Sequence, residues 1–335
     1  MGLLFPVLSV SLLWLVLLPA AALGAAAALA GLTRLGGARF GRWLTLRYLL
    51  LVLPTLLPLA WAFSAALHLA EPGRSVLACL LAHDLAELCL EPLLLLLLLS
   101  AAVGTRALPL LRALRRQHGA AARPALERVE ALVRHEPSLK ELVGRVRVAR
   151  APLGGVVALG LVRPRVVLGA DFVERCDDEA LVGALAHELE HVRGLDPLRY
   201  LLLALCLRVN PAGEWLLGRH AAAWIFAREV QCDRAAVLGG APAFGVARAL
   251  LQASRPASPA LAHIQGAPTK LRLRVELLLS YAERRPVDDV TRGPAALLAG
   301  ALLLALALAL PHRAGSSALD GFHTRVETLA ARALH

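Results

Sequence analysis

The sequence predicts a predominantly α-helical membrane protein in which about four transmembrane helices carry an α+β domain, inserted between the third and fourth spans. Hydrophobic residues make up 58% of the 335 residues, and the mean hydropathy is +0.62, which is too apolar for a soluble protein of this size. Long apolar runs alternate with short Arg-rich segments. Residues 106–292 are more polar and long enough for one compact domain.

Residues 1–105 are predicted to form the transmembrane region, with spans at about 3–32, 48–69 and 85–104. These runs match the roughly 20 residues that a helix needs to cross the hydrocarbon layer. No Lys or Arg precedes the first run, so the basic start of a signal peptide is missing and we expect this span to be retained.

Arginine clusters without acidic residues follow the first and third spans and set the expected orientation. The clusters are Arg34, Arg39, Arg42 and Arg47, and then Arg106, Arg112, Arg115, Arg116 and Arg123. We therefore expect residues 106–292 to face the cytoplasm, a fourth span at 293–311, and a short extracytoplasmic tail at 312–335. The predicted location is the cytoplasmic (inner) membrane, crossed several times.

The formal net charge of +11 comes largely from these juxtamembrane clusters, which suit the anionic headgroups of membrane lipid. No recognition motif indicates direct binding of nucleic acid. Just before the firmly apolar part of the third span lie His83, Asp84, Glu87 and Glu91. We favour an interfacial helix with its polar face in the headgroups. The alternative is a functional polar site at membrane depth.

The polar domain contains the motif His187-Glu188-x-x-His191 within a predicted helix. Histidines four residues apart lie on one helix face, so both imidazoles can bind one Zn²⁺. Glu188 lies beside them, where it can act as a general base toward water. Asp177 is a good N-cap for this helix and Gly194 a good C-terminal stop. The alternative is a surface helix with solvated side chains.

A second helical pattern carries Glu229 and Asp233, again four residues apart. A catalytic zinc site commonly has three protein ligands and a water, so Glu229 is the candidate third ligand. Asp233 is a candidate to orient a ligand histidine. The alternative is an ordinary surface acidic pair. Asp196, which precedes Pro197, is equally a helix cap or a second carboxylate of that supporting kind.

Several further motifs surround these residues: Val192-Arg193-x-x-Asp196, the run from Gly160 to Leu168, Asn210-Pro211, and Arg228-Glu229-x-x-Cys232-Asp233. Together they resemble the BlaR/MecR-type membrane metallopeptidases of bacteria over about residues 150–240. More distantly, the chain is similar to the HtpX and CAAX-prenyl protease group. The resemblance implies a gluzincin-type zinc peptidase domain. It implies one catalytic Zn²⁺ on His187, His191 and Glu229, with Glu188 as general base.

Predicted strands at Val146–Val148, Val156–Leu161 and Arg165–Leu168 precede the metal helix. Zinc peptidases commonly hold a substrate as an added strand beside that helix. We assign this edge to Val166, Val167 and Leu168, with a plain core hairpin as an equal alternative. For the group that stabilises the developing oxyanion, the sequence leaves Tyr200, Arg234, His263 and Arg274 open. The five cysteines lack paired metal spacing, and we expect buried, unpaired thiols.

The expected function is that of an integral membrane zinc metalloendopeptidase in signalling, cleaving a transcriptional repressor or itself, as the resemblance implies. About 25 residues follow Leu310, too few for the large extracellular sensor of the beta-lactam receptors. A signal would then enter through the spans, the tail or a sensor partner protein. The alternatives are quality control of membrane proteins, as in the HtpX group, and a non-catalytic receptor or scaffold.

Overall fold

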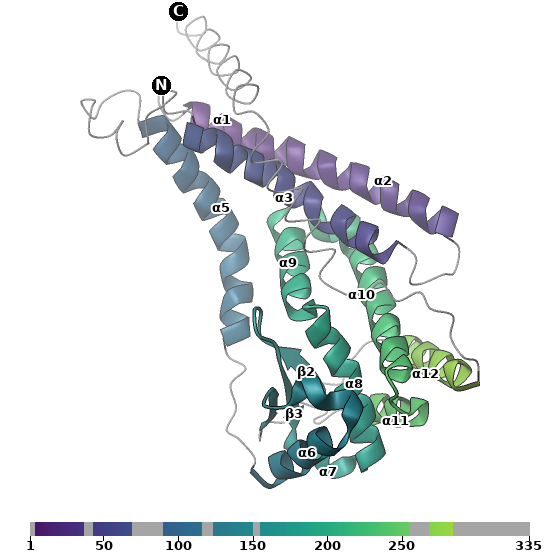
Figure 1. Ribbon diagram of the computed structural model, residues 1–335. Helices are drawn as coiled ribbons and strands as arrows, with labels where there is room; N and C mark the ends of the chain where they lie inside the picture. Colours follow the sequence, from purple (N-terminus) through teal and green to yellow (C-terminus); the bar gives the residue numbers. More distant parts are fainter. Residues whose placement is uncertain are drawn as a thin grey trace, which may run out of the picture.

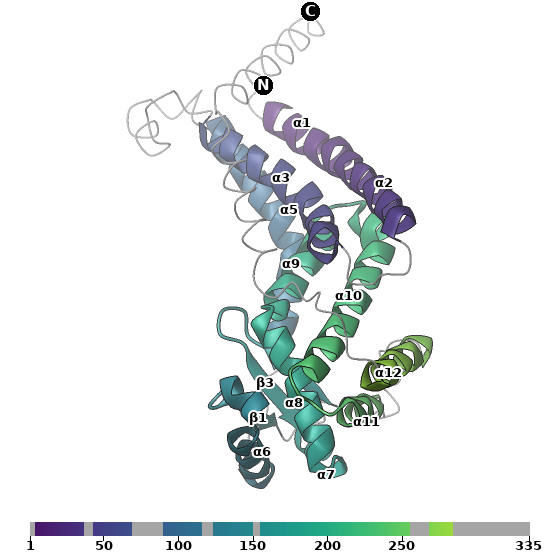
Figure 2. The ribbon, with the colours of Figure 1, turned by 45° about the vertical axis from the view of Figure 1, so that its right-hand side comes forward.

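The computed structural model describes residues 4–36, 43–68, 90–115, 123–149, 155–254 and 268–283. The described chain is mostly helical, with one small sheet (Figure 1). Apolar helices gather at one end of the molecule and the sheet lies at the other, and further helices run between these ends (Figures 1 and 2). The predicted class, predominantly α with a small β component, agrees with this description.

The apolar end consists of three helices among the described residues. The first helix comprises α1 (Leu4–Leu12), a π-helical segment (Leu13–Leu17) and α2 (Leu18–Gly36), and α3 (Leu44–His68) and α5 (Leu90–Arg115) follow. Two stretches, Val7–Arg34 and Leu44–Phe63, are long and apolar enough to cross a membrane, with mean hydropathies of 2.2 and 1.7. They correspond to the first two predicted spans.

The third predicted span, 85–104, lies only partly within the described residues, where its apolar stretch Leu97–Pro109 is shorter than a full span. The fourth predicted span, 293–311, and the tail lie outside the described residues. The same holds for His83, Asp84, Glu87 and the side chain of Glu91.

The polar domain contains one sheet and seven α-helices among the described residues. Its elements are α6 (Arg123–His135), a 3-10 helix (Pro137–Leu142), β1 (Val146–Ala149), β2 (Val156–Leu159), β3 (Arg165–Gly169), α7 (Ala170–Arg175), α8 (Asp178–Arg193), α9 (Asp196–Val209), α10 (Gly213–Leu238), α11 (Ala243–Ala253) and α12 (Pro268–Glu283). The strand order is β1-β3-β2, with β1 parallel and β2 antiparallel to β3.

This strand order corrects one prediction. Val166–Leu168 is not an edge strand, because β3 lies between β1 and β2. Val166 and Leu168 are fully buried, as expected for a central strand. The hairpin of β2 and β3 is local in sequence, whereas the pairing of β1 with β3 crosses a loop and leaves no pattern in the sequence. The strand at the edge of the sheet that packs against α8 is β2.

Helix α8 lies at the centre of the domain and is buried along most of its length. Asp177 caps it as predicted, because its carboxylate accepts a hydrogen bond from the Ala180 N–H at 2.8 Å. Helix α11 crosses α8 closely at Gly183, where an added Cβ would lie 2.4 Å from the Val246 nitrogen. This close approach brings α11 over the same helix that carries the His-Glu-x-x-His motif.

Candidate metal centre

Three helices bring the predicted site residues together. Helix α8 contributes His187, Glu188 and His191, and α10 contributes Glu229 and Asp233. Asp196, the first residue of α9, lies beside them and is fully buried. The histidines are also buried, whereas the Glu229 side chain keeps 24% of its surface exposed. The geometry is therefore that of a shielded cluster with one partly open ligand.

The metal-ligating atoms of three side chains lie close together: those of His187, His191 and Glu229. The two imidazole Nε2 atoms are 3.1 Å apart. Each also lies 3.4 Å from an oxygen of the Glu229 carboxylate. Ligands about 2.0–2.1 Å from a tetrahedral zinc ion are about 3.3 Å from one another, so these spacings fit a zinc site. The donor set can thus hold a metal ion.

The far side of each imidazole contacts a carboxylate. His191 Nδ1 lies 2.7 Å from Asp196 Oδ2. His187 Nδ1 lies 2.8 Å from Asp233 Oδ1, although the angle is poorer than that of a hydrogen bond. A carboxylate favours the tautomer that carries its proton on Nδ1, which leaves the Nε2 lone pair available for a metal. Asp233 and Asp196 thus each lie against the far side of one imidazole.

Arginines neutralise these carboxylates. Arg274 of α12 makes a two-pronged contact with Asp233 at 2.7 and 2.8 Å, and its third nitrogen lies 3.1 Å from Glu229. On the other side, Arg228 donates to Asp196 at 2.7 Å. Arg199 donates to the same carboxylate at 3.1 Å. The buried negative charges are therefore paired, as buried charges must be.

The pKa values follow from burial and these charges. Burial alone would lower the pKa of His187, but the Asp233 and Glu229 carboxylates outweigh it and raise that pKa to about 10. Burial would raise the pKa of Glu229, yet His191, His187 and Arg274 hold it well below its usual range. Glu229 is therefore ionised, which is the form that binds a metal.

Glu188 has the opposite environment. Burial raises the pKa of its carboxyl above the ordinary value, and the neighbouring histidines only partly offset this. Its carboxyl also interacts with the backbone of Ala158 in β2. A raised pKa makes this carboxyl a stronger proton acceptor than an ordinary carboxylate, which is the property that a general base needs.

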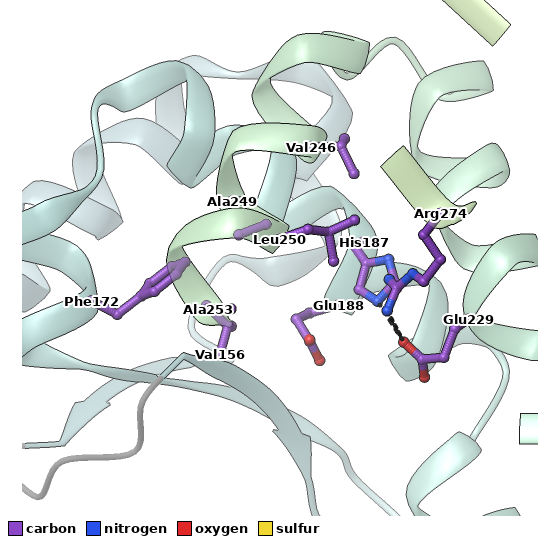
Figure 3. Close-up of a pocket in the computed structure, with 11 residues that line it drawn as sticks. Val156, Phe172, His187, Glu188, Glu229, Val246, Ala249, Leu250, Ala253 and Arg274 are labelled. Atoms are coloured by element: carbon purple, nitrogen blue, oxygen red, sulfur yellow. Dashed lines mark ion pairs between the residues drawn. The ribbon is translucent and has the colours of Figure 1, made fainter. Parts of the chain in front are cut away.

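A cavity of about 190 Å³ opens beside the cluster (Figure 3). His187, Glu188, Glu229 and Arg274 line its polar side. Its apolar wall is built from Val156 of β2, Phe172 of α7, Ala184 of α8, and Val246, Ala249, Leu250 and Ala253 of α11. The cavity therefore joins an apolar space to the candidate metal ligands and the candidate base.

The remaining sequence predictions fall in different places. Three of the four candidates for the oxyanion group lie within the described residues, and of these only Arg274 lines the cavity. The Tyr200 hydroxyl donates to Glu229 at 3.1 Å, and His263 lies outside the described residues. Three cysteines, Cys176, Cys206 and Cys232, are free and buried as predicted. The other two lie outside the described part of the chain.

The sequence did not indicate three of the neighbours of the site. Arg199 and Arg228 were not recognised as partners of Asp196, and Cys232 lies 3.6 Å from His191 Nδ1. His191, Asp196 and Cys232 form a second group with metal-ligating atoms. The Arg228 guanidinium already occupies the Asp196 carboxylate there, so a cation is disfavoured. The adjacency of Arg228 to the candidate ligand Glu229 was the one available sign.

Gly194 makes room for this arginine. An added Cβ would lie 2.3 Å from the Arg228 Nη2 atom and 3.1 Å from the Asp196 carboxylate. Gly194 itself has an ordinary helical conformation, and the left-handed residue that ends α8 is Leu195, with φ of 51°. The predicted stop at Gly194 is therefore correct in position, but close packing rather than backbone freedom requires the glycine.

Substituting Asp196→Asn is expected to weaken zinc binding by about 10- to 100-fold, the usual cost of losing a carboxylate that orients a ligand histidine. Zinc titration of the purified protein measures this. The matched control is Asp171→Asn, which removes a carboxylate paired with Arg175 at 2.8 Å on the surface of α7. An unchanged affinity in Asp196→Asn would show that Asp196 does not support His191.

Comparison with protein-family models, with curated proteins and with solved structures found no match to this chain.

Proposed function

We propose that this protein is an integral membrane zinc endopeptidase that acts in regulated proteolysis on the cytoplasmic side of the inner membrane. One observation carries the proposal: the Nε2 atoms of His187 and His191 lie 3.1 Å apart, each is 3.4 Å from an oxygen of the Glu229 carboxylate, and the buried Glu188 carboxyl lines the cavity beside them. His187, His191 and Glu229 would hold the zinc ion. A non-catalytic scaffold could use the three metal ligands, but it would have no use for a general base at Glu188.

A bound zinc ion would supply an acidified water and polarise the carbonyl of a peptide bond. Glu188 accepts the proton of the attacking water and delivers it to the leaving amine. Arg274 lines the cavity with a positive charge and stabilises the oxygen that becomes negative during attack. Asp233 and Asp196 hold the two histidines in orientation. All of these side chains come from α8, α9, α10 and α12.

The edge strand β2 is the proposed docking site for a substrate backbone. The Gly155 carbonyl accepts a hydrogen bond from the Gly169 N–H at 3.0 Å. In an antiparallel pair the bonding direction alternates, so Val156 and Ala158 point their backbone groups away from β3. The Ala158 backbone interacts with the Glu188 carboxyl, so this edge of β2 runs beside the candidate base. An extended peptide added there would pass the site.

A test uses the purified full-length protein and an unfolded protein as substrate. We expect cleavage to stop when a chelator removes the metal, and to return on addition of one equivalent of zinc. Cleavage that survives complete metal removal would contradict the proposal. The fragments then divide two roles: one repressor-like target in cells favours signalling, whereas many membrane proteins favour quality control. Because α9 and α10 pack against the apolar helices, quality control of membrane proteins is the second candidate function.

A further inference from the structure

The candidate metal centre is tied directly to the start of an apolar helix. The Trp224 indole N–H donates to the Leu44 carbonyl at 3.0 Å, and Leu44 begins the candidate span Leu44–Phe63. Trp224 is buried and packs against the Tyr48 ring, with centroids 5.0 Å apart. Tyr200 packs on Trp224 in turn and donates to Glu229. The rings of Trp224 and Tyr48 are both buried inside the protein, so these contacts fix the position of α10 along α3.

This contact gives a first estimate of depth. Glu229 follows Trp224 by five residues in α10, which is about 8 Å along the axis at 1.5 Å per residue. If the hydrocarbon begins near Leu44, the candidate metal centre lies at most about 8 Å outside it, because any tilt of α10 shortens this height, and it lies in or next to the headgroup layer.

The tip of the α9–α10 hairpin gives a second estimate. Asn210 donates from its side chain to the Leu18 carbonyl at 3.0 Å, and Thr55 donates to the Cys206 carbonyl at 3.2 Å. Leu18 and Thr55 lie near the middle of the two candidate spans. Glu229 is sixteen residues beyond Gly213, the start of α10, which is about 24 Å. Half of the hydrocarbon thickness is about 15 Å, so at most about 9 Å remain.

The outer face of α10 suits this depth. Trp215 is 84% exposed and Ile225 is 39% exposed, and Arg219, Ala222 and Ala223 are exposed between them. The Arg219 guanidinium donates to the His220 ring at 3.3 Å. The charged side chains at the tip, Arg208 and Glu214, lie 4.0 Å apart and line a polar cavity of about 300 Å³ with Arg106 of α5. That cavity offers them solvation away from acyl chains, as membrane-buried charges require.

Resting on the proposed peptidase function, we propose that the substrates are membrane-anchored polypeptides, cut in the unfolded segment next to their own span. A gap of about 9 Å is too small for a folded domain, whose radius of gyration is about 13 Å for 100 residues. An extended chain covers the gap in about three residues at 3.3 Å each. Anchoring also raises the local concentration of that segment.

The depth can be measured without proteolysis. A fluorescent amino acid replaces Ile225, and a control replaces Phe244, which is 62% exposed at the start of α11 beyond the metal centre. The full-length protein is placed in vesicles whose lipids carry bromine on the acyl chains near the headgroup. We expect the probe at Ile225 to lose most of its fluorescence and the probe at Phe244 to lose none. An unquenched Ile225 probe would overturn the inference.

The substrate class is tested in the same vesicles with three reporters. The first joins a transmembrane span to a long unstructured segment, the second carries that segment in reversed order, and the third lacks the span. We expect cuts that require Glu188 to cluster within about 12 residues of the span in both orders, about 40 Å of extended chain. The unanchored segment should be cut at least about tenfold more slowly.

Two results would overturn the substrate class. In the reporter with the reversed segment, the cuts could move with the sequence to the end far from the span. Alternatively, the unanchored segment could be cut as fast as the anchored one. A different result would be a quenched Ile225 probe together with no Glu188-dependent cut in any reporter. That result would refute the peptidase function, and the proposed substrate class, which rests on it, would fail as well. In that case the position of the metal centre at the membrane surface still holds, so the two failures are distinguishable.

Discussion

Substituting Glu188→Gln is expected to lower the rate of peptide cleavage by about 10²- to 10⁴-fold, the usual contribution of a general base. The amide has nearly the same shape as the carboxyl, but it cannot accept the proton of the attacking water. The zinc content should stay at one per chain, because Glu188 is not among the grouped donor atoms. Cleavage of an unfolded protein substrate and elemental analysis measure the two quantities.

The matched control for this variant is Glu190→Gln in the same helix. Glu190 is also buried, but it pairs with Arg193 and does not line the cavity. It should keep wild-type cleavage once corrected for the amount of folded protein. Full activity in Glu188→Gln would refute the proposed mechanism. Loss of zinc in that variant would mean that Glu188 serves the metal site rather than the proton transfer.

Removing a ligand is expected to have the largest effect on the metal. Glu229→Ala should lower zinc affinity by more than the 10- to 100-fold typical of supporting residues, because one of three donor atoms is lost. The variant also leaves the third nitrogen of Arg274 without its contact to Glu229. Bound ligand stabilises the folded state by about 2.7 kcal/mol at 100 times its Kd, so zinc should raise the Tm of the wild type only.

The surface variant Glu276→Ala is the control, because Glu276 pairs with Arg272 on the exposed side of α12. It should bind zinc as the wild type does. Retention of one tightly bound zinc ion per chain in Glu229→Ala would remove Glu229 from the ligand set. The alternative predicted from the sequence, a surface acidic pair, would then describe Glu229 and Asp233 better.

The sequence predicts the local part of this site because its information is local. The spacing of His187 and His191 places both on one helix face, and the Asp177 cap depends on residues within one turn. Long apolar helices are equally evident from composition, and two of the predicted spans match described helices. Asp233 and Glu229 share a face for the same reason as the histidines.

Contacts between distant segments could not be predicted. Asp196 begins a helix, and the sequence alone leaves it equally a cap. In the structure Leu195 is the N-cap, and the Asp196 carboxylate contacts His191, Arg199 and Arg228. Arg274 reaches Asp233 from 41 residues away. The central position of β3 depends on a parallel partner, β1, that no hairpin pattern indicates. Such pairings arise only when the elements pack together.

The most direct test of the account compares new protein N-termini in cells that express the wild type and Glu188→Gln at equal levels. We predict a set of N-termini that is present with the wild type and absent with the variant, while both purified proteins carry one zinc ion per chain. Identical N-termini in the two strains, together with a purified wild type that binds no zinc, would contradict the assignment of His187, His191 and Glu229 as a catalytic metal site.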